Sequence, residues 1–296
     1  MIDRRHFLAT AGTALAAGLL GATPFAARAA GAAADAMDPA GLERRSGGRL
    51  GVAILDSGSG RRLAWRAEER FPMASTFKFL LAAAVLARVD RGEVRLDQPL
   101  RFGPEDRVSW SPVVEARMDE GQASVADLCE ATVTWSDNAA ANLLLGLVDG
   151  PAGLTRFLRG LGDPVTRLDR MEPELNSAEP GDPRDTTTPA AMVATLGRLL
   201  LGDVLTPASR AQLTYWLRTN HTGNARLRAG MPPGWQAGDK TGSFAGTAND
   251  VGILWPPGRP PVLVAAYLTG ASIDGAGRDA VLADVGRLAV GLAAAG

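Results

Sequence analysis

The stretch at residues 72–78 reads Pro-Met-Ala-Ser-Thr-Phe-Lys and places Ser75 three residues before Lys78. The apolar run that follows, 79–86, contains neither glycine nor proline, and it predicts a buried helix that begins near Ser75. Positions i and i+3 share a helix face, so the Lys78 amine is expected one turn behind the Ser75 hydroxyl. A serine hydroxyl becomes a strong nucleophile only when a neighbouring base takes its proton.

Lysine usage supports a chemical role for Lys78. Only Lys78 and Lys240 are lysines among the 31 Lys and Arg residues. Arginine cannot act as a base in a protein, whereas a desolvated lysine can. The two lysines therefore mark positions at which arginine would not serve, although Ser-x-x-Lys alone also fits a capping serine beside a surface lysine.

Composition and the N-terminus limit the class of protein. The 296 residues are 46% apolar, which is typical of a globular chain. The formal net charge is −1, so electrostatics give no reason to expect a nucleic-acid partner. Residues 1–30 predict a twin-arginine-type signal peptide, with Arg4 and Arg5 before an apolar stretch at 8–20 that is too short to favour a retained anchor. The mature protein is expected to be exported, periplasmic or secreted, and free of the membrane after cleavage.

Histidine and cysteine are scarce, which excludes several kinds of site. Cys129 is the one cysteine, so no internal disulfide is possible, and its helical surroundings predict a small buried hydrophobic side chain. His6 belongs to the predicted signal, which leaves His221, in a polar turn, for the mature chain. A histidine-rich zinc site is excluded, a Ser-His-Asp triad would depend on His221 alone, and no metal or cofactor is expected.

Strand patterns occur near both ends of the mature chain, and helical patterns fill the middle. The pattern predicts an α+β fold, in which an antiparallel sheet with flanking helices receives an inserted all-α domain and the active site lies between them. We expect a discontinuous sheet domain formed by residues 38–67 and 218–296. A helical domain, 68–217, is expected to include a loop at 167–185, where three prolines prevent regular structure.

Three further motifs carry polar groups suited to catalysis. Ser136-Asp137-Asn138 precedes a helical stretch, and it fits either a helix cap or a hydroxyl and an amide that face a cleft. The loop contains Glu172, a candidate general base at a candidate cis bond to Pro173, with Asn176 four residues later. Lys240-Thr241-Gly242-Ser243 lies on a predicted strand, where the glycine permits close approach of another backbone or a ligand.

Together these motifs resemble those of the class A β-lactamases and penicillin-binding proteins, in order and spacing, from about residue 40 to the C-terminus. The resemblance implies a β-lactam substrate and an acyl-enzyme on Ser75, with the backbone amides of Ser75 and Ser243 as the oxyanion hole. Lys78, or Glu172 acting through a water, would take the serine proton. Ser136 would protonate the leaving nitrogen, and Glu172 would activate the deacylating water.

The resemblance also implies the remaining site residues. The expected catalytic residues are Ser75, Lys78, Ser136, Glu172 and Lys240. The expected substrate-binding residues are Trp110, Asn138, Asn176, Arg226, Thr241, Gly242 and Ser243. Arg170 and Asp185 are expected to form the ion pair that closes the loop carrying Glu172. No partner other than the small substrate is expected, and the protein is expected to be a monomer.

Two departures leave the substrate spectrum open. Trp110, Arg226 and Ser243 resemble features of the carbapenem-hydrolysing branch of the family, with Arg226 in place of an arginine that many members carry on the strand after Lys-Thr-Gly. Ala74 and Phe244, however, stand where that branch has its disulfide cysteines.

Three alternatives share the serine. A D-alanyl-D-alanine peptidase or penicillin-binding protein would have similar motifs but would not need Glu172 and Asn176. An exported β-lactam sensor would acylate and stay acylated, and a small Ser-x-x-Lys esterase would differ in its substrate. The Glu172-Pro-Glu-Leu-Asn176 segment favours the hydrolase.

Overall fold

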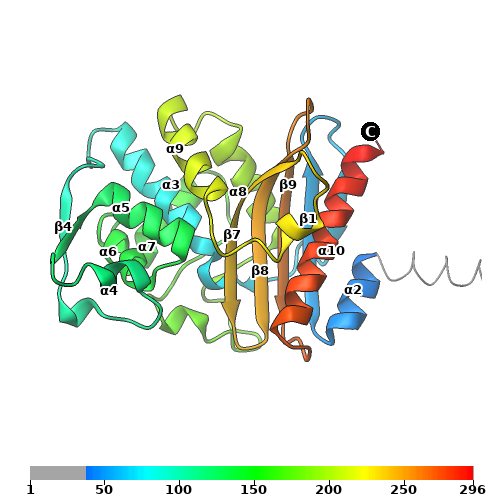
Figure 1. Cartoon of the computed structure of the whole chain (residues 1–296), viewed down its shortest axis with the longest axis horizontal. Coiled ribbons are helices and arrows are strands. Elements are labelled where there is room, and N and C mark those ends of the chain that lie inside the picture. Colours follow the sequence, from blue (N-terminus) through cyan, green and yellow to red (C-terminus); the bar gives the residue numbers. More distant parts are fainter. Residues whose placement is uncertain (1–37, 296) are drawn as a thin grey trace, which may run out of the picture.

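A five-stranded antiparallel sheet forms the centre of the molecule (Figure 1), in a computed structural model that describes residues 38–295. The strand order is β2-β1-β9-β8-β7, so the two N-terminal strands join the three C-terminal ones. The strands are β1 (Arg49–Asp56), β2 (Arg62–Trp65), β7 (Gln236–Phe244), β8 (Thr247–Trp255) and β9 (Val262–Thr269). The predicted signal peptide at 1–30 lies outside the described residues.

Helices α2 (Pro39–Ser46) and α10 (Gly275–Ala294) cover one face of this sheet (Figure 1). The sequence places the last helix at 278–295, but it begins at Gly275 because the side chain of Asp274 accepts a hydrogen bond from Gly277 N and caps it. Apolar side chains of α10 form a core with the outer-facing residues of β1, β8 and β9.

The opposite face packs against the helical middle of the chain. Its central helix is α3 (Phe77–Asp90), in which every residue from Phe77 to Ala87 is buried. A helix that is apolar on all sides must lie inside a core, and α3 is therefore the central, buried helix of this half of the molecule. The surrounding helices are α4 (Pro112–Ala116), α5 (Val125–Glu130), α6 (Asn138–Gly146), α7 (Gly150–Gly160), α8 (Pro189–Leu200) and α9 (Pro207–Arg218).

Two short two-stranded sheets and several single turns connect the helices of this segment. Strand β3 (Phe71–Pro72), just before Ser75, pairs with β6 (Thr186–Thr187), just after the long loop, and β4 (Pro99–Arg101) pairs with β5 (Gln122–Ser124). The 3-10 turns are η1 (Ala74–Thr76), η2 (Pro104–Asp106), η4 (Glu174–Asn176) and η5 (Leu227–Gly230), and η3 (Ala131–Trp135) is a π-helical turn.

The α+β fold class predicted from the sequence is confirmed. The division into domains stays a prediction, since one continuous apolar core joins the helical middle to the inner face of the sheet. Within the described residues, we find no helix that combines the length and the apolar character required to cross a bilayer.

Candidate active site

Ser75 lies in the 3-10 turn η1, immediately before α3. The α-helix proper begins at Phe77, slightly later than predicted, but residues three apart also lie over one another in a 3-10 turn. Ala74 has a left-handed φ of 44°, which strains a residue that has a Cβ. The segment is held by Asn249, whose Nδ2 donates to Pro72 O at 2.9 Å and to Met73 O at 3.0 Å.

Lys78 is completely buried and is surrounded by oxygen atoms. Its Nζ donates to Ser136 O at 2.8 Å and to Asn138 Oδ1, and it lies 3.4 Å from Ser136 Oγ. Glu172 Oε1 lies 3.0 Å away as an ion pair, although the approach lacks the alignment of a hydrogen bond. Burial lowers the pKa of Lys78, and the charge of Glu172 opposes that shift, so this amine loses its proton more easily than an exposed lysine.

Ser136 links the two lysines of the chain. Lys240, also completely buried, places its Nζ 3.1 Å from Ser136 Oγ, so the same hydroxyl contacts both lysines. Burial and the charge of Lys78 both hold the pKa of Lys240 well below its ordinary value. Ser136 has a left-handed φ of 60° and ends the π-helical turn η3, which turns its hydroxyl toward both amines. The arrangement can pass a proton between a lysine and a group in the cleft.

Glu172 is held at its backbone and at its carboxylate. Asn176 Nδ2 donates to Glu172 Oε2 at 2.6 Å, and the Glu172-Pro173 bond is cis. Asn142 on α6 clamps the Glu172 backbone, accepting from its N–H at 3.0 Å and donating to its C=O at 2.9 Å. The sequence analysis missed Asn142; the available signal is an amide four residues after Asn138, on the same face of an otherwise apolar helix.

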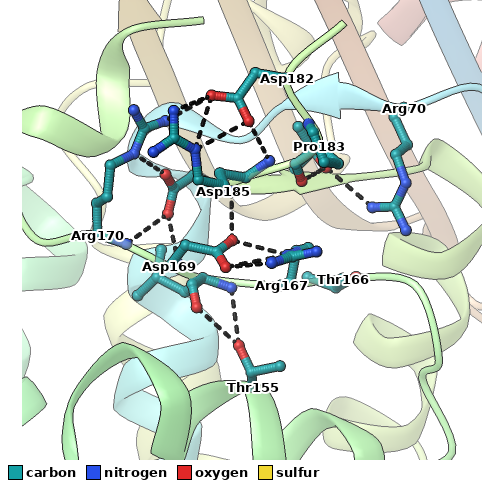
Figure 2. A network of polar contacts seen from close by, with 12 residues as sticks. Arg70, Thr155, Thr166, Arg167, Asp169, Arg170, Asp182, Pro183 and Asp185 are labelled. Atoms are coloured by element: carbon teal, nitrogen blue, oxygen red, sulfur yellow. Dashed lines mark hydrogen bonds and ion pairs between the residues drawn. The ribbon is translucent and has the colours of Figure 1, made fainter.

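The loop that carries Glu172 is closed by Arg170 and Asp185 (Figure 2). Arg170 Nε donates to Asp185 Oδ2 at 2.6 Å, and Asp185 Oδ1 accepts from the backbone N–H groups of Asp169 and Arg170. The Asp185 carbonyl accepts from Met73 N at 2.9 Å. The pair therefore connects the loop directly to the segment that precedes Ser75.

Strand β7 approaches the nucleophile turn closely at Gly242. A Cβ built on Gly242 would lie 2.7 Å from Met73 O and 3.1 Å from Ser75 N, so the predicted close backbone contact is present. Thr241 Oγ1 shares a hydrogen bond of 2.5 Å with Thr222 Oγ1. Arg226 reaches over the strand and donates to Ser243 Oγ at 2.6 Å.

These groups line one cleft of about 460 Å³ between the helices and the edge of the sheet. Of the predicted site residues, the cleft wall contains Ser75, Trp110, Ser136, Asn138, Asn176, Arg226, Thr241, Gly242 and Ser243. Lys78, Lys240 and Glu172 lie just behind this wall through the contacts given above. Trp110 is strongly exposed at the mouth, and its Nε1 donates to Trp135 O at 3.1 Å. The structure thus brings all twelve predicted catalytic and substrate-binding residues together, whereas their roles stay predictions.

Comparison with known proteins identifies the family. The Beta-lactamase enzyme family matches residues 35–292. The chain is 50% identical to β-lactamase L2 of Stenotrophomonas maltophilia, over 98% of both chains. The chain belongs to the class A β-lactamases. It is also 49% identical to the carbapenem-hydrolyzing β-lactamase KPC of Klebsiella oxytoca, over 84% of this chain and 85% of that one. The structure of an ancestral class A β-lactamase is 62% identical, with a TM-score of 0.84 over 85% of this chain and 97% of that one.

Two residues to which the sequence analysis gave no catalytic role, His221 and Cys129, are not among the described residues that line the cleft. His221 is exposed, and its ring stacks on Trp135 at 4.3 Å between centroids. Cys129 is free and buried in α5, as predicted, and burial raises the pKa of its thiol. Among the residues that the structure describes, no cluster of His, Cys, Asp and Glu side chains could hold a metal ion.

Replacing Gly242 with alanine is expected to lower kcat/KM for benzylpenicillin by about 10²-fold, because the new Cβ pushes β7 away from the Ser75 amide. The measurement is steady-state hydrolysis. Gly291→Ala is the matched control, since a Cβ on this α10 glycine meets nothing within 4 Å. Equal activity of the two variants would contradict the close approach described here.

Replacing Asp185 with alanine is expected to reduce the free energy of unfolding by about 3–5 kcal/mol, since it removes the nearest carboxylate of the partly buried Arg170 and the acceptor of two backbone N–H groups. Urea unfolding measures the change. Glu179→Ala, at an exposed position of the same loop, serves as the control and should be close to neutral. If Asp185→Ala were equally neutral, the ion pair would not hold the loop.

Proposed function

We propose that this class A β-lactamase hydrolyses the amide bond of penicillin- and cephalosporin-type β-lactams through an acyl-enzyme on Ser75, and so gives resistance to these antibiotics. One observation carries the proposal. Buried Lys78 lies 3.0 Å from the Glu172 carboxylate and is linked to Lys240 by the hydroxyl of Ser136, directly behind the turn that presents Ser75. The similarity to the L2 and KPC β-lactamases supports the same reaction.

Acylation forms a bond from Ser75 Oγ to the β-lactam carbonyl carbon and then breaks the bond from that carbon to the ring nitrogen. The proton of Ser75 passes to Lys78, whose lowered pKa favours a neutral amine, or to Glu172 through a water. Ser136 then gives a proton to the departing nitrogen and is resupplied from the lysines beside it. The backbone amides of Ser75 and Ser243, adjacent to the contact at Gly242, receive the oxyanion.

Deacylation requires a water positioned against the ester. Glu172 and Asn176 form a buried carboxylate–amide pair beside the cleft, with one carboxylate oxygen held by the amide at 2.6 Å. A carboxylate so fixed can take a proton from a water while the amide orients it. The water oxygen then bonds to the ester carbon, the bond from that carbon to Ser75 Oγ breaks, and Ser75 Oγ regains a proton as the product leaves. A D-alanyl-D-alanine peptidase has no need for this pair, which favours the hydrolase.

The direct test is loss of the β-lactam absorbance of benzylpenicillin, with Ser75→Ala as the inactive control. A D-alanyl-D-alanine peptide and a simple ester are assayed beside it. We expect multiple turnovers of benzylpenicillin only. Faster hydrolysis of the peptide or of the ester would replace this proposal with the peptidase or the esterase.

We further propose that the protein is exported through its twin-arginine signal and acts as a monomer outside the cytoplasm. The sequence Arg4-Arg5 before the apolar stretch supports export. Replacing both arginines with lysine should retain the precursor in the cytoplasmic fraction. Sedimentation of the mature protein at working concentrations would show a dimer if the second part of this proposal were wrong.

A further inference from the structure

Two carboxyl groups lie buried side by side on the paired strands β7 and β8, and the mechanism above uses neither of them. Asp239 and Asp250 have no exposed surface. Asp250 stands opposite Thr241 in the β7–β8 register, and Thr241 is two residues from Asp239 on the same face. The two carboxyl groups are therefore diagonal neighbours across the strands, close enough for the charge of Asp239 to act on Asp250.

The surroundings of the two carboxyl groups differ. Asp239 Oδ1 accepts a hydrogen bond from Arg228 Nε, and Asp239 Oδ2 accepts one from Asn220 Nδ2 at 2.8 Å. Both donors stabilise the ionised form of Asp239. Asp250 Oδ2 receives one backbone N–H, that of Leu227, at 3.1 Å. Within the part of the chain that the structure describes, Asp250 Oδ1 has no donor. A buried acceptor without a donor is costly, unless the oxygen carries a proton and donates it.

A proton on Asp250 resolves both the missing donor and the repulsion between two adjacent carboxylates. Burial raises the pKa of Asp250 well above its ordinary value, the charge of Asp239 raises it further, and Arg226 opposes both. The titratable and charged groups around Asp250 are Asp239 and Lys240 on β7, Arg226 before η5, and Tyr267 on β9.

The pair holds the two residues that immediately follow Arg226, Leu227 at its backbone N–H and Arg228 at its guanidinium. Leu227 is tied to Asp250 and Arg228 to Asp239, so both residues after Arg226 are fixed to the sheet. The Arg226 side chain then reaches Asn249 O at 2.8 Å, Gly242 O at 3.1 Å and Ser243 Oγ at 2.6 Å. A shift of this turn would move the guanidinium at the cleft wall.

We propose that a protonated Asp250, donating to Asp239, is a positioning residue that fixes the Arg226 turn against β7 and so sets the binding of substrate at the cleft wall. The effect on substrate binding rests on the proposed function, whereas the protonation of Asp250 does not. It also gives a pH dependence. Because the folded pKa is raised, the stability contributed by Asp250 is complete below its unfolded pKa of about 3.9 and is lost as pH rises through the folded value.

Two substitutions of Asp250 distinguish the effect of its proton from the effect of its side-chain volume. Asp250→Asn imitates the protonated acid, since its amide can donate to Asp239 and its carbonyl can accept from Leu227. It should keep KM for benzylpenicillin within about twofold at pH 7 and should not lose stability as pH rises. Asp250→Ala should raise KM about tenfold with kcat little changed, because both hydrogen bonds are lost.

The deciding readout is the difference infrared spectrum of wild type and Asp250→Asn at pH 7. We expect a carboxylic-acid C=O band in the wild type that the variant lacks. No such band, or an Asp250→Asn variant as impaired in KM as Asp250→Ala, would overturn the proposal. The spectrum and the pH dependence of urea unfolding need no substrate, so failure of the proposed β-lactam hydrolysis would not be mistaken for failure of this inference.

Discussion

Replacing Glu172 with glutamine is expected to slow steady-state turnover of benzylpenicillin by about 10²- to 10⁴-fold. Glutamine keeps the volume and the contact with Asn176 but cannot take a proton from the deacylating water. Stopped-flow measurements should show a burst of one equivalent of ring opening, followed by slow turnover. The burst arises because acylation precedes the step that fails.

The matched control is Glu174→Gln, which changes an exposed glutamate two residues later, at the start of the turn η4. It should turn over like the wild type. The burst rate also distinguishes the two candidate bases for acylation. Glu172→Gln removes a charge that raises the pKa of Lys78, so a rapid burst indicates Lys78 as the base, whereas loss of the burst, with acylation as slow as turnover, indicates Glu172.

Replacing Lys78 with arginine is expected to lower kcat/KM by about 10²- to 10⁴-fold, although the positive charge is kept. The guanidinium cannot lose its proton to act as a base, and the completely buried site has no room for the larger group. Pre-steady-state acylation by benzylpenicillin measures the chemical step. Circular dichroism and urea unfolding report any loss of the fold.

Lys240→Arg provides the comparison for this prediction. Lys240 is not a candidate for the base that takes the Ser75 proton, and arginine can still place N–H donors beside Ser136 Oγ. Its acylation rate should therefore fall less than that of Lys78→Arg. An active Lys78→Arg variant would exclude Lys78 as the base.

The fold could be predicted from the sequence where local signals are strong. Strand patterns near both ends of the mature chain predicted the two parts of the sheet, and the apolar run after Lys78 predicted helix α3. The boundaries moved where a cap or a tight turn decides them, as at Asp274 and at the 3-10 turn around Ser75. These shifts follow from side-chain hydrogen bonds and backbone angles, which a hydrophobic pattern does not encode.

The site could be predicted as a set of motifs but not as a set of contacts. The resemblance named Lys78, Ser136 and Glu172, yet only the fold shows that Ser136 lies between both lysines. Asn142 and the Asp239–Asp250 pair were missed because each acts through residues distant in sequence. A single amide in an apolar helix, or an aspartate in a strand, gives no sign of its partner until the strands are paired.

The central claim is that Ser75 carries an acyl group which Glu172 removes. Intact mass spectrometry of the mature protein mixed with benzylpenicillin, followed by peptide mapping, tests it directly. We predict free wild-type enzyme with hydrolysed product, and a Glu172→Gln variant that accumulates one intact benzylpenicilloyl adduct on Ser75. A lasting adduct on the wild type, or an adduct on a residue other than Ser75, would contradict the account.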